Sequence, residues 1–245
     1  MIIIKNDNEV SLMRKAGKIV GETLFLLENE IKPGITTAEL DRIAEEFITK
    51  HGAKPSFKGL YGFPSSLCIS VNEQVIHGIP GEYMLKDGDI VSIDCGACIN
   101  GFHGDAARTF PVGDISSNAQ KLIDVTKESF FKGIEYAKVG NKLGDISHEI
   151  QSYVEAAGFS VVRDFVGHGI GTNVHEDPDV PNFGKAGIGP DLVKGMVLAI
   201  EPMVNMGKHK VKTLRNGWTV VTRDSSLSAH YERRTRNINT SLSRN

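Results

Sequence analysis

The chain has 245 residues and a net charge of −2, with 24% charged and 40% hydrophobic residues, so it is long enough for one large hydrophobic core or two small ones. This balance supplies no basic field for DNA or an anionic membrane, and no apolar run approaches the length of a membrane-spanning helix. Three cysteines, Cys68, Cys95 and Cys98, are few and odd in number, which is typical of reduced thiols in a cytoplasmic protein.

The first half of the chain has the pattern of two helices followed by strands. Apolar residues recur at helical spacing from residue 8 to about residue 30, and Pro33-Gly34 ends the pattern. Thr36-Thr37-Ala38-Glu39 has the form of a capping box for a second helix, which Gly52 ends. A loop is then expected at 55–67, with strands at 67–76, 90–93 and 107–112. The turn Asn100-Gly101 predicts a hairpin between the last two strands.

The second half repeats this order. Ser117-Asn118-Ala119-Gln120 has the form of another capping box, and a further helix through Ile146 and Tyr153 ends at Gly158. The remaining expected segments are a strand at 161–166, a loop at 171–191 and strands at 196–200, 211–214 and 218–222. No linker that would separate two independent domains is evident between the halves.

An internal repeat connects the two halves. The matching segments are 85–94 with 192–201, 32–53 with 138–159, and two His-Gly-Ile triplets at 77–79 and 168–170. The repeat predicts two related helix-helix-strand halves, about 9–112 and 116–232, that share one sheet with their helices outside. Because each repeated strand ends on a carboxylate, Asp94 or Glu201, we expect a metal site at the seam between the halves.

The hairpin places two carboxylates side by side. A two-residue turn at Asn100-Gly101 pairs residues whose numbers sum to 201, so Asp94 faces Ala107 and Asp105 lies two residues away on the same face. Such diagonal neighbours are roughly 7–8 Å apart at the backbone, which lets both carboxylates reach one metal pair. The alternative is a pair of solvated hairpin acids, but an unpaired charge after the apolar strand before Asp94 would be costly.

Further donors lie in the second half. His168 stands between glycines, His175 follows seven residues later, and Glu201 precedes Pro202 where its strand is expected to end. Carboxylates with one imidazole suit Mn, Fe(II), Co or Zn. Glu232 is the candidate for a further, shared carboxylate.

Several motifs together resemble the type I bacterial methionine aminopeptidases. The resemblance implies their pita-bread fold, an α+β fold in which a pseudo-twofold relates the two helix-helix-strand halves around one curved antiparallel sheet. The resemblance runs from about residue 5 to Glu232, as a single catalytic domain over 1–232. The motifs are Ser70-Val71-Asn72-Glu73 through His77-Gly78-Ile79-Pro80, Asp94-Cys95-Gly96, His103-Gly104-Asp105, Gly167-His168-Gly169-Ile170-Gly171, His175-Glu176-Asp177-Pro178, Ile200-Glu201-Pro202-Met203, Asn216-Gly217-Trp218-Thr219 and Ser228-Ala229-His230-Tyr231-Glu232.

The resemblance implies a role for each candidate. Asp94 would bind one divalent ion, His168 and Glu201 the other, and Asp105 and Glu232 would bridge the two. The ions would activate a water, Glu201 would relay a proton, and His77 and His175 would contact the substrate. The implied methionine pocket consists of Cys68, Trp218, Phe63, Leu60 and Phe57.

The implied activity is removal of the initiator methionine from nascent polypeptides with a small second residue. The same resemblance implies a cytoplasmic monomer. The ribosome is a candidate partner, and binding to DNA or to a membrane is not expected. Two alternatives remain: a proline-specific peptidase of the same fold, and a non-catalytic pita-bread protein that binds nucleic acid or the ribosome. The first generally carries an extra N-terminal domain, and the second generally loses metal ligands.

The end of the chain departs from the family pattern. Residues 233–245 are rich in arginine and asparagine, which makes a poor buried strand. An altered reading frame or a divergent, disordered tail would each explain this composition. Either would weaken the strand that holds Glu232. Cys95-Gly96-Ala97-Cys98 is interpreted as structural, because no second cysteine pair accompanies it.

Overall fold

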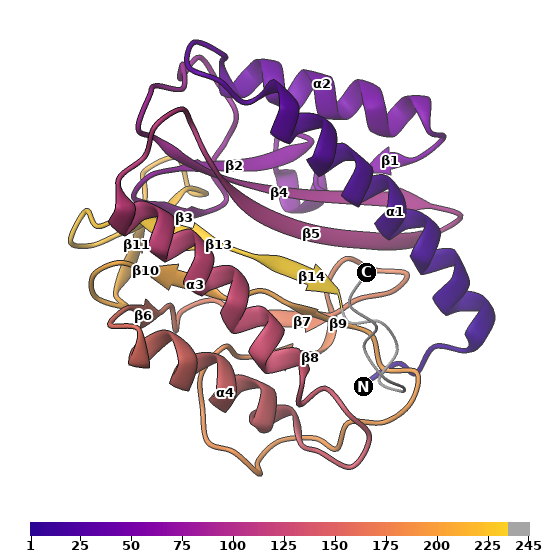
Figure 1. Cartoon of the computed structure of the whole chain (residues 1–245). Helices are drawn as coiled ribbons and strands as arrows, with labels where there is room; N and C mark the ends of the chain where they lie inside the picture. The colour runs from indigo at the N-terminus through magenta and orange to yellow at the C-terminus, as the bar shows by residue number, and fades with distance from the viewer. Residues whose placement is uncertain (235–245) are drawn as a thin grey trace.

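The computed structural model describes residues 1–234 (Figure 1). Its helices are α1 (Asp7–Glu30), α2 (Thr37–Lys50), the short 3₁₀-helix η1 (Leu60–Gly62), α3 (Ser117–Ile134) and α4 (Leu143–Ala156). Its strands are β1 (Lys54–Pro55), β2 (Leu67–Val71), β3 (Gln74–Ile76), β4 (Ile90–Ile99), β5 (Phe102–Pro111), β6 (Ser160–Val161), β7 (Gly167–Gly169), β8 (Glu176–Val180), β9 (Leu198–Ile200), β10 (Met203–Asn205), β11 (Val211–Thr213), β12 (Val220–Thr222), β13 (Ser228–His230) and β14 (Glu232–Arg234).

The largest sheet joins both halves of the chain. Its strand order is β1-β4-β5-β14-β9-β7-β8, with β2 also paired to β4, and every pair is antiparallel. The carboxylate strands β4 and β9 flank the central pair β5 and β14, as a pseudo-twofold arrangement requires. Two three-stranded sheets, β13-β10-β6 and β11-β12-β3, accompany it, so the single predicted sheet is in fact one large and two small ones.

The helices form two pairs that cover the sheet. In Figure 1, α1 and α2 lie over the first half, and α3 and α4 lie over the second. Helix α1 packs on β4 and β5, whereas α3 packs on α4 and β13. One buried apolar cluster joins α1, α2, β2 and β4 through residues such as Leu24, Ile48, Ile69 and Ile93. Burial of these side chains is the main favourable contribution to holding the helices against the sheet.

Local sequence explains where the main elements begin and turn. Helix α1 starts with a capping box in which Asn6 and Glu9 satisfy each other's backbone N–H groups. The β4–β5 turn has positive φ at Asn100 and Gly101, 54° and 77°, as this hairpin type requires. The predicted register is confirmed, because Asp94 lies opposite Ala107.

The capping box at α1 was not predicted, and the two that were predicted differ in detail. At α2, Thr36 accepts from the N–H of Glu39, but the Glu39 carboxylate accepts hydrogen bonds from Arg42 instead of closing the box. At α3, the cap is Ser116, one residue before the predicted position. In both cases one side-chain cap is sufficient to begin the helix.

Several predicted strand boundaries are wrong. The strand expected at 67–76 is two strands, β2 and β3, which belong to different sheets. The strand expected at 161–166 stops at Val161, and β8 lies within the expected loop 171–191. The strands β10 and β13 were not predicted. These elements are only two to five residues long, so they carry too little periodicity to be recognised.

The two His-Gly-Ile triplets are not equivalent in space. His168-Gly169 lies inside β7, beside β9 in the large sheet. His77-Gly78 follows β3, which pairs with β12 in a small sheet. The sequence match at this point therefore does not reflect the pseudo-twofold.

The start of the atypical tail belongs to the sheet. Strand β14 places Glu232 opposite Ala107 of β5 and pairs Arg233 with Ile200 of β9. The arginine-rich composition was expected to make a poor buried strand, yet residues 233 and 234 continue β14, because Arg233 pairs with both β5 and β9 and Arg234 pairs with β9. Residues 235–245, and the hypotheses about them, lie outside the described part of the chain. Within residues 1–234, none of the helices has the length and apolar character needed to cross a bilayer.

We expect Gly104→Ala to destabilise the fold. A Cβ at Gly104 would lie 2.6 Å from the backbone nitrogen of Gly17, so α1 would have to move away from β5. Such overpacking should lower the free energy of unfolding by about 1–3 kcal/mol in denaturant titrations. The control is Gly21→Ala on α1, where an added Cβ meets no atom within 4 Å. It should raise stability by about 0.5–1 kcal/mol. Equal effects of the two changes would contradict the close approach.

Candidate metal centre

Four carboxylates project from neighbouring strands at the centre of the large sheet. Asp94 of β4 and Glu232 of β14 both lie opposite Ala107 of β5, in one row across the sheet. Arg233 pairs with Ile200, so Glu201, the next residue, continues the row. Asp105 lies two residues from Ala107 and therefore faces the same side. The antiparallel register thus brings four acids from both halves to one face.

These carboxylates are poorly supplied with partners. The exposed fractions of Asp105 and Glu232 are only 5% and 3%. Within residues 1–234, one buried oxygen on each of Asp94, Asp105 and Glu232 has no hydrogen-bond partner. Burial raises the pKa of Asp94 to about 7, and burial together with neighbouring carboxylates raises the pKa of Asp105 and of Glu232 well above the usual range. Unpaired buried acids at this density are the donor set that a bound cation would neutralise.

His168 contributes an imidazole suited to metal binding. Its Nδ1–H donates to the carbonyl oxygen of Gly169 at 2.9 Å, which leaves the lone pair on Nε2. Nε2 lies 3.5 Å from Oε1 of Glu201, on the inner side of the site. Burial and the nearby His175 lower the pKa of His168 to about 4, so the ring is neutral near pH 7. A neutral imidazole with a free Nε2 is the usual histidine ligand.

The ligand atoms fall into two overlapping groups. Those of Asp105, His168 and Glu232 lie within 4.8 Å of one another, and so do those of Glu201, His230 and Glu232. Four of the five predicted ligands belong to these groups, with Glu232 common to both, and the fifth, Asp94, lies in the same row of the sheet opposite Ala107. It also adds His230, which the sequence interpretation missed. Its spacing of two residues from Glu232 is the signal that could have identified it.

An apolar cluster adjoins the carboxylates. Cys68 lies directly opposite Asp94 in the sheet, so its side chain faces the same side. The predicted pocket residues pack together around it with two that were not predicted. The cluster consists of Phe57, Leu60, Phe63, Cys68, Ile79, Val174 and Trp218. The rings of Phe63 and Trp218 meet edge to face at 5.1 Å, which gives one wall a fixed shape.

The two remaining predicted histidines lie at the edge of this site. The rings of His175 and His168 meet edge to face with centroids 4.5 Å apart, and Tyr61 stacks on the other side of His175 at 5.9 Å. His77 has a positive φ of 57° and packs against the ring of Phe165. Burial, with His175 nearby, lowers the pKa of His77 to about 4, so this ring is neutral as well.

Comparison with known proteins identifies the family. Residues 11–232 match metallopeptidase family M24. The chain belongs to this metallopeptidase family. It is therefore a hydrolase of peptide bonds that uses divalent metal ions, and the orphaned carboxylates described above fit that requirement.

Individual relatives agree with this assignment. The chain is 77% identical to the methionine aminopeptidase of Clostridium perfringens over 232 residues. This match covers 95% of this chain and 93% of that protein. The crystal structure of methionine aminopeptidase from Rickettsia prowazekii superimposes with a TM-score of 0.95 at 44% identity, covering 97% of each chain. The prolidase of Pyrococcus furiosus, at 22% identity and a TM-score of 0.76, shows the shared fold, and 66% of that chain is covered. The predicted resemblance and the pita-bread fold are thereby confirmed.

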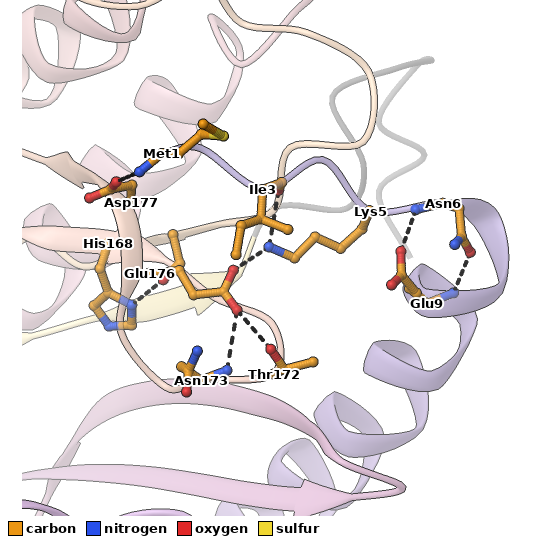
Figure 2. Close-up of polar contacts among 11 residues, drawn as sticks. Met1, Ile3, Lys5, Asn6, Glu9, His168, Thr172, Asn173, Glu176 and Asp177 are labelled. Carbon is orange, nitrogen blue, oxygen red and sulfur yellow. Dashed lines mark hydrogen bonds and ion pairs between the residues drawn. The ribbon is translucent and has the colours of Figure 1, made fainter.

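A buried ion pair anchors the segment of the metallopeptidase that carries His175. Figure 2 shows Lys5 reaching from the N-terminal segment to Glu176, the residue after His175. The side chains of this pair are only 4% and 2% exposed. Glu176 also accepts from the N–H of Asn173 at 3.2 Å and the hydroxyl of Thr172 at 3.4 Å. Glu176 thus joins the start of the loop, at Thr172 and Asn173, to Lys5 of the N-terminal segment.

Lys5→Met should destabilise the metallopeptidase and slow it. Removing one partner leaves Glu176 buried and uncompensated, which should cost about 3–5 kcal/mol in denaturant titrations. The loop position of His175 should also become less defined, and misplacement of this kind can lower kcat by up to about 100-fold. Arg42→Met is the control, because Arg42 pairs with Glu39 and Glu46 on an exposed helix face. It should change neither property appreciably. Equal stability of the two variants would contradict the anchoring role.

The metal-free metallopeptidase should lose stability as the pH rises above about 6.5. In the unfolded chain, acids titrate near pH 4 and histidines near 6.5. Below pH 6.5 the raised carboxylate pKa values and the lowered pKa values of His77, His168 and His230 have opposite effects on stability. As the pH rises above about 6.5 the histidines of the unfolded chain lose their remaining charge, so their opposing effect disappears. The folded carboxylates still hold protons that the unfolded chain has released, so the free energy of unfolding falls.

Thermal unfolding of chelator-treated protein at a series of pH values measures this trend. Saturating divalent metal should reverse it, because ligand carboxylates bind the ion in their ionised form. A metal-free protein that becomes more stable from about pH 6.5 to pH 8 would show that the carboxylates are ionised without a cation.

Proposed function

We propose that this metallopeptidase is a methionine aminopeptidase that removes the N-terminal methionine from polypeptides. The observation that carries the proposal is the contact between the apolar cluster and the carboxylate row, through Cys68 opposite Asp94. An unbranched thioether side chain suits an apolar pocket walled by aromatic rings and a thiol. The side chain of residue one would then occupy the cluster while its peptide bond lies beside the carboxylates.

We further propose that the centre holds two divalent ions. Asp94 would bind one ion, His168 and Glu201 the other, and Asp105 and Glu232 both. Glu232 suits the shared position because it belongs to both groups of ligand atoms. Cobalt, manganese, Fe(II) and zinc all accept this set of oxygens and one nitrogen. When bound, such ions supply a nucleophile from water near neutral pH and polarise the carbonyl under attack.

The chain's own residues perform the remaining steps in this proposal. His175, beside His168, would donate a hydrogen bond to the carbonyl oxygen as negative charge develops there. His77 would hold the nitrogen of the scissile amide. Glu201 would take a proton on a carboxylate oxygen and pass it to the leaving nitrogen. In the metal-free protein, burial, with Asp94 and Asp105 nearby, raises the pKa of Glu201 well above its usual range.

The biological setting follows from the proposed substrate. The substrates would be nascent polypeptides whose second residue is small, and the protein would act in the cytoplasm as a monomer. Association with the ribosome remains a prediction. Of the two rival functions, a proline-specific peptidase finds support only from structures that share the fold. A non-catalytic role does not explain why the donor atoms of four of the five proposed ligands, Asp105, His168, Glu201 and Glu232, converge.

Peptide cleavage tests the proposal directly. Purified protein is treated with chelator, restored with each metal in turn, and given Met-Ala-Ser and an X-Pro peptide. We expect release of methionine from the first peptide only, and only after metal is restored. Preferred cleavage of the X-Pro peptide, or of neither, would overturn the proposal in favour of one rival or the other.

Asp105→Asn should abolish this turnover while leaving the fold intact. The change removes a bridging charge but preserves the shape of the side chain. Mutating a group that only holds a ligand costs roughly 10–100-fold in activity, so losing a ligand itself should cost more. The matched control is Asp124→Asn on the exposed side of α3, which should keep full activity. Circular dichroism confirms folding. An active Asp105→Asn variant would eliminate the bridging role.

A further inference from the structure

His230 is a buried histidine with an unused nitrogen. Its exposed fraction is 2%, and within residues 1–234 its Nε2 is a buried atom with no hydrogen-bond partner. Nε2 lies 3.7 Å from Oε2 of Glu201. The predicted ligand set does not include His230. An unsatisfied buried nitrogen costs free energy unless it has a partner in the working state of the protein.

The backbone of His230 is held firmly. Its N–H donates to the hydroxyl of Thr109 at 2.9 Å, and that hydroxyl donates back to the carbonyl oxygen of His230 at 2.9 Å. Thr109 is bonded in turn to Ser92 of β4 at 2.7 Å. In addition, His230 pairs with Met203 in the β10–β13 ladder. The imidazole therefore projects from a rigid position between two sheets, as a side chain that orients another group should.

The two oxygens of Glu201 face different imidazoles. Oε1 lies 3.5 Å from Nε2 of His168, and Oε2 lies 3.7 Å from Nε2 of His230. The proposed centre assigns His168 and Glu201 to the same ion, so Oε1, the oxygen beside His168, would face that ion, and Oε2 would be free to accept a hydrogen bond. A closure from 3.7 Å to roughly 2.9 Å would complete that bond.

We propose that His230 is a positioning residue that donates Nε2–H to Oε2 of Glu201 and so directs Oε1 toward the ion. The inference rests on the proposed metal centre and adds a residue to it. Carboxylates that bind metals are commonly held by such outer hydrogen bonds, and losing one costs about 10–100-fold in metal affinity or activity. The competing role is direct ligation, because the ligand atoms of Glu201, His230 and Glu232 lie within 4.8 Å of one another.

Three substitutions separate these roles. Gln places an amide N–H near the position of the histidine Nε2 but is a poor metal ligand, whereas Asn is one methylene shorter and Leu has no donor. We expect His230→Gln to keep metal affinity and kcat close to the unaltered protein. His230→Asn and His230→Leu should each weaken metal affinity about 10–100-fold. His51→Leu, at the exposed end of α2, is the control and should change nothing.

Metal affinity is measured by competition with a chromophoric chelator, and the ligand set by the visible absorption spectrum of the Co(II)-loaded protein. An unchanged spectrum with His230→Gln supports positioning. A changed spectrum, with affinity as low as that of His230→Leu, would establish direct ligation and overturn the proposal. Unaltered metal affinity in His230→Asn would also overturn the positioning role. This variant replaces His230→Leu in the comparison if the Leu variant does not fold. Methionine release by the unaltered protein tests the proposed function separately.

Discussion

The burial of four carboxylates on one face of a sheet is the constraint on which the rest of the structure depends. Burial and the neighbouring carboxylates raise the pKa values of Asp105, Glu201 and Glu232. Asp94, Asp105 and Glu232 each have an oxygen without a partner among residues 1–234. Such an arrangement is tolerable only if protons or cations neutralise it. The apolar clusters of both halves must therefore supply enough stability to hold the acids together before metal arrives.

The sheet meets this demand through its strand order. The strands β5 and β14 lie at the centre, with β4 and β9 outside them. Each acid lies on a different one of these strands or, for Glu201, directly after one, and the backbone pairing of the strands fixes its position. Loops would hold these side chains less firmly, and like charges would push them apart. The two histidines His168 and His175 are held by different kinds of structure. His168 belongs to the sheet, whereas His175 lies on a loop that Lys5 and Glu176 fasten from outside. The proposed metal ligands thus lie on or directly beside the sheet, whereas His175, the proposed substrate contact, lies on a loop.

The proposed pocket and the proposed metal centre lie on neighbouring strands of one sheet. Cys68 of β2 lies opposite Asp94 of β4, so the surface that would select a side chain adjoins the surface that would cleave its peptide bond. Val174 and Ile79 join the same cluster, each near a histidine in sequence. Selection of the first residue and alignment of its carbonyl would therefore be coupled by geometry, which is how binding at one end of a substrate can contribute to catalysis at the other.

The sequence by itself determined the helix pairs, the hairpin register at Asn100-Gly101 and the candidate ligands, because these depend on local periodicity, turn chemistry and residue type. Only the tertiary structure decided that β14 extends past Glu232, that the His-Gly-Ile triplets are unrelated in space, and that His230 faces Glu201. These depend on pairing between segments more than a hundred residues apart or between strands of two or three residues. Such short strands carry no period of their own, and their partners are fixed by burial of the whole sheet.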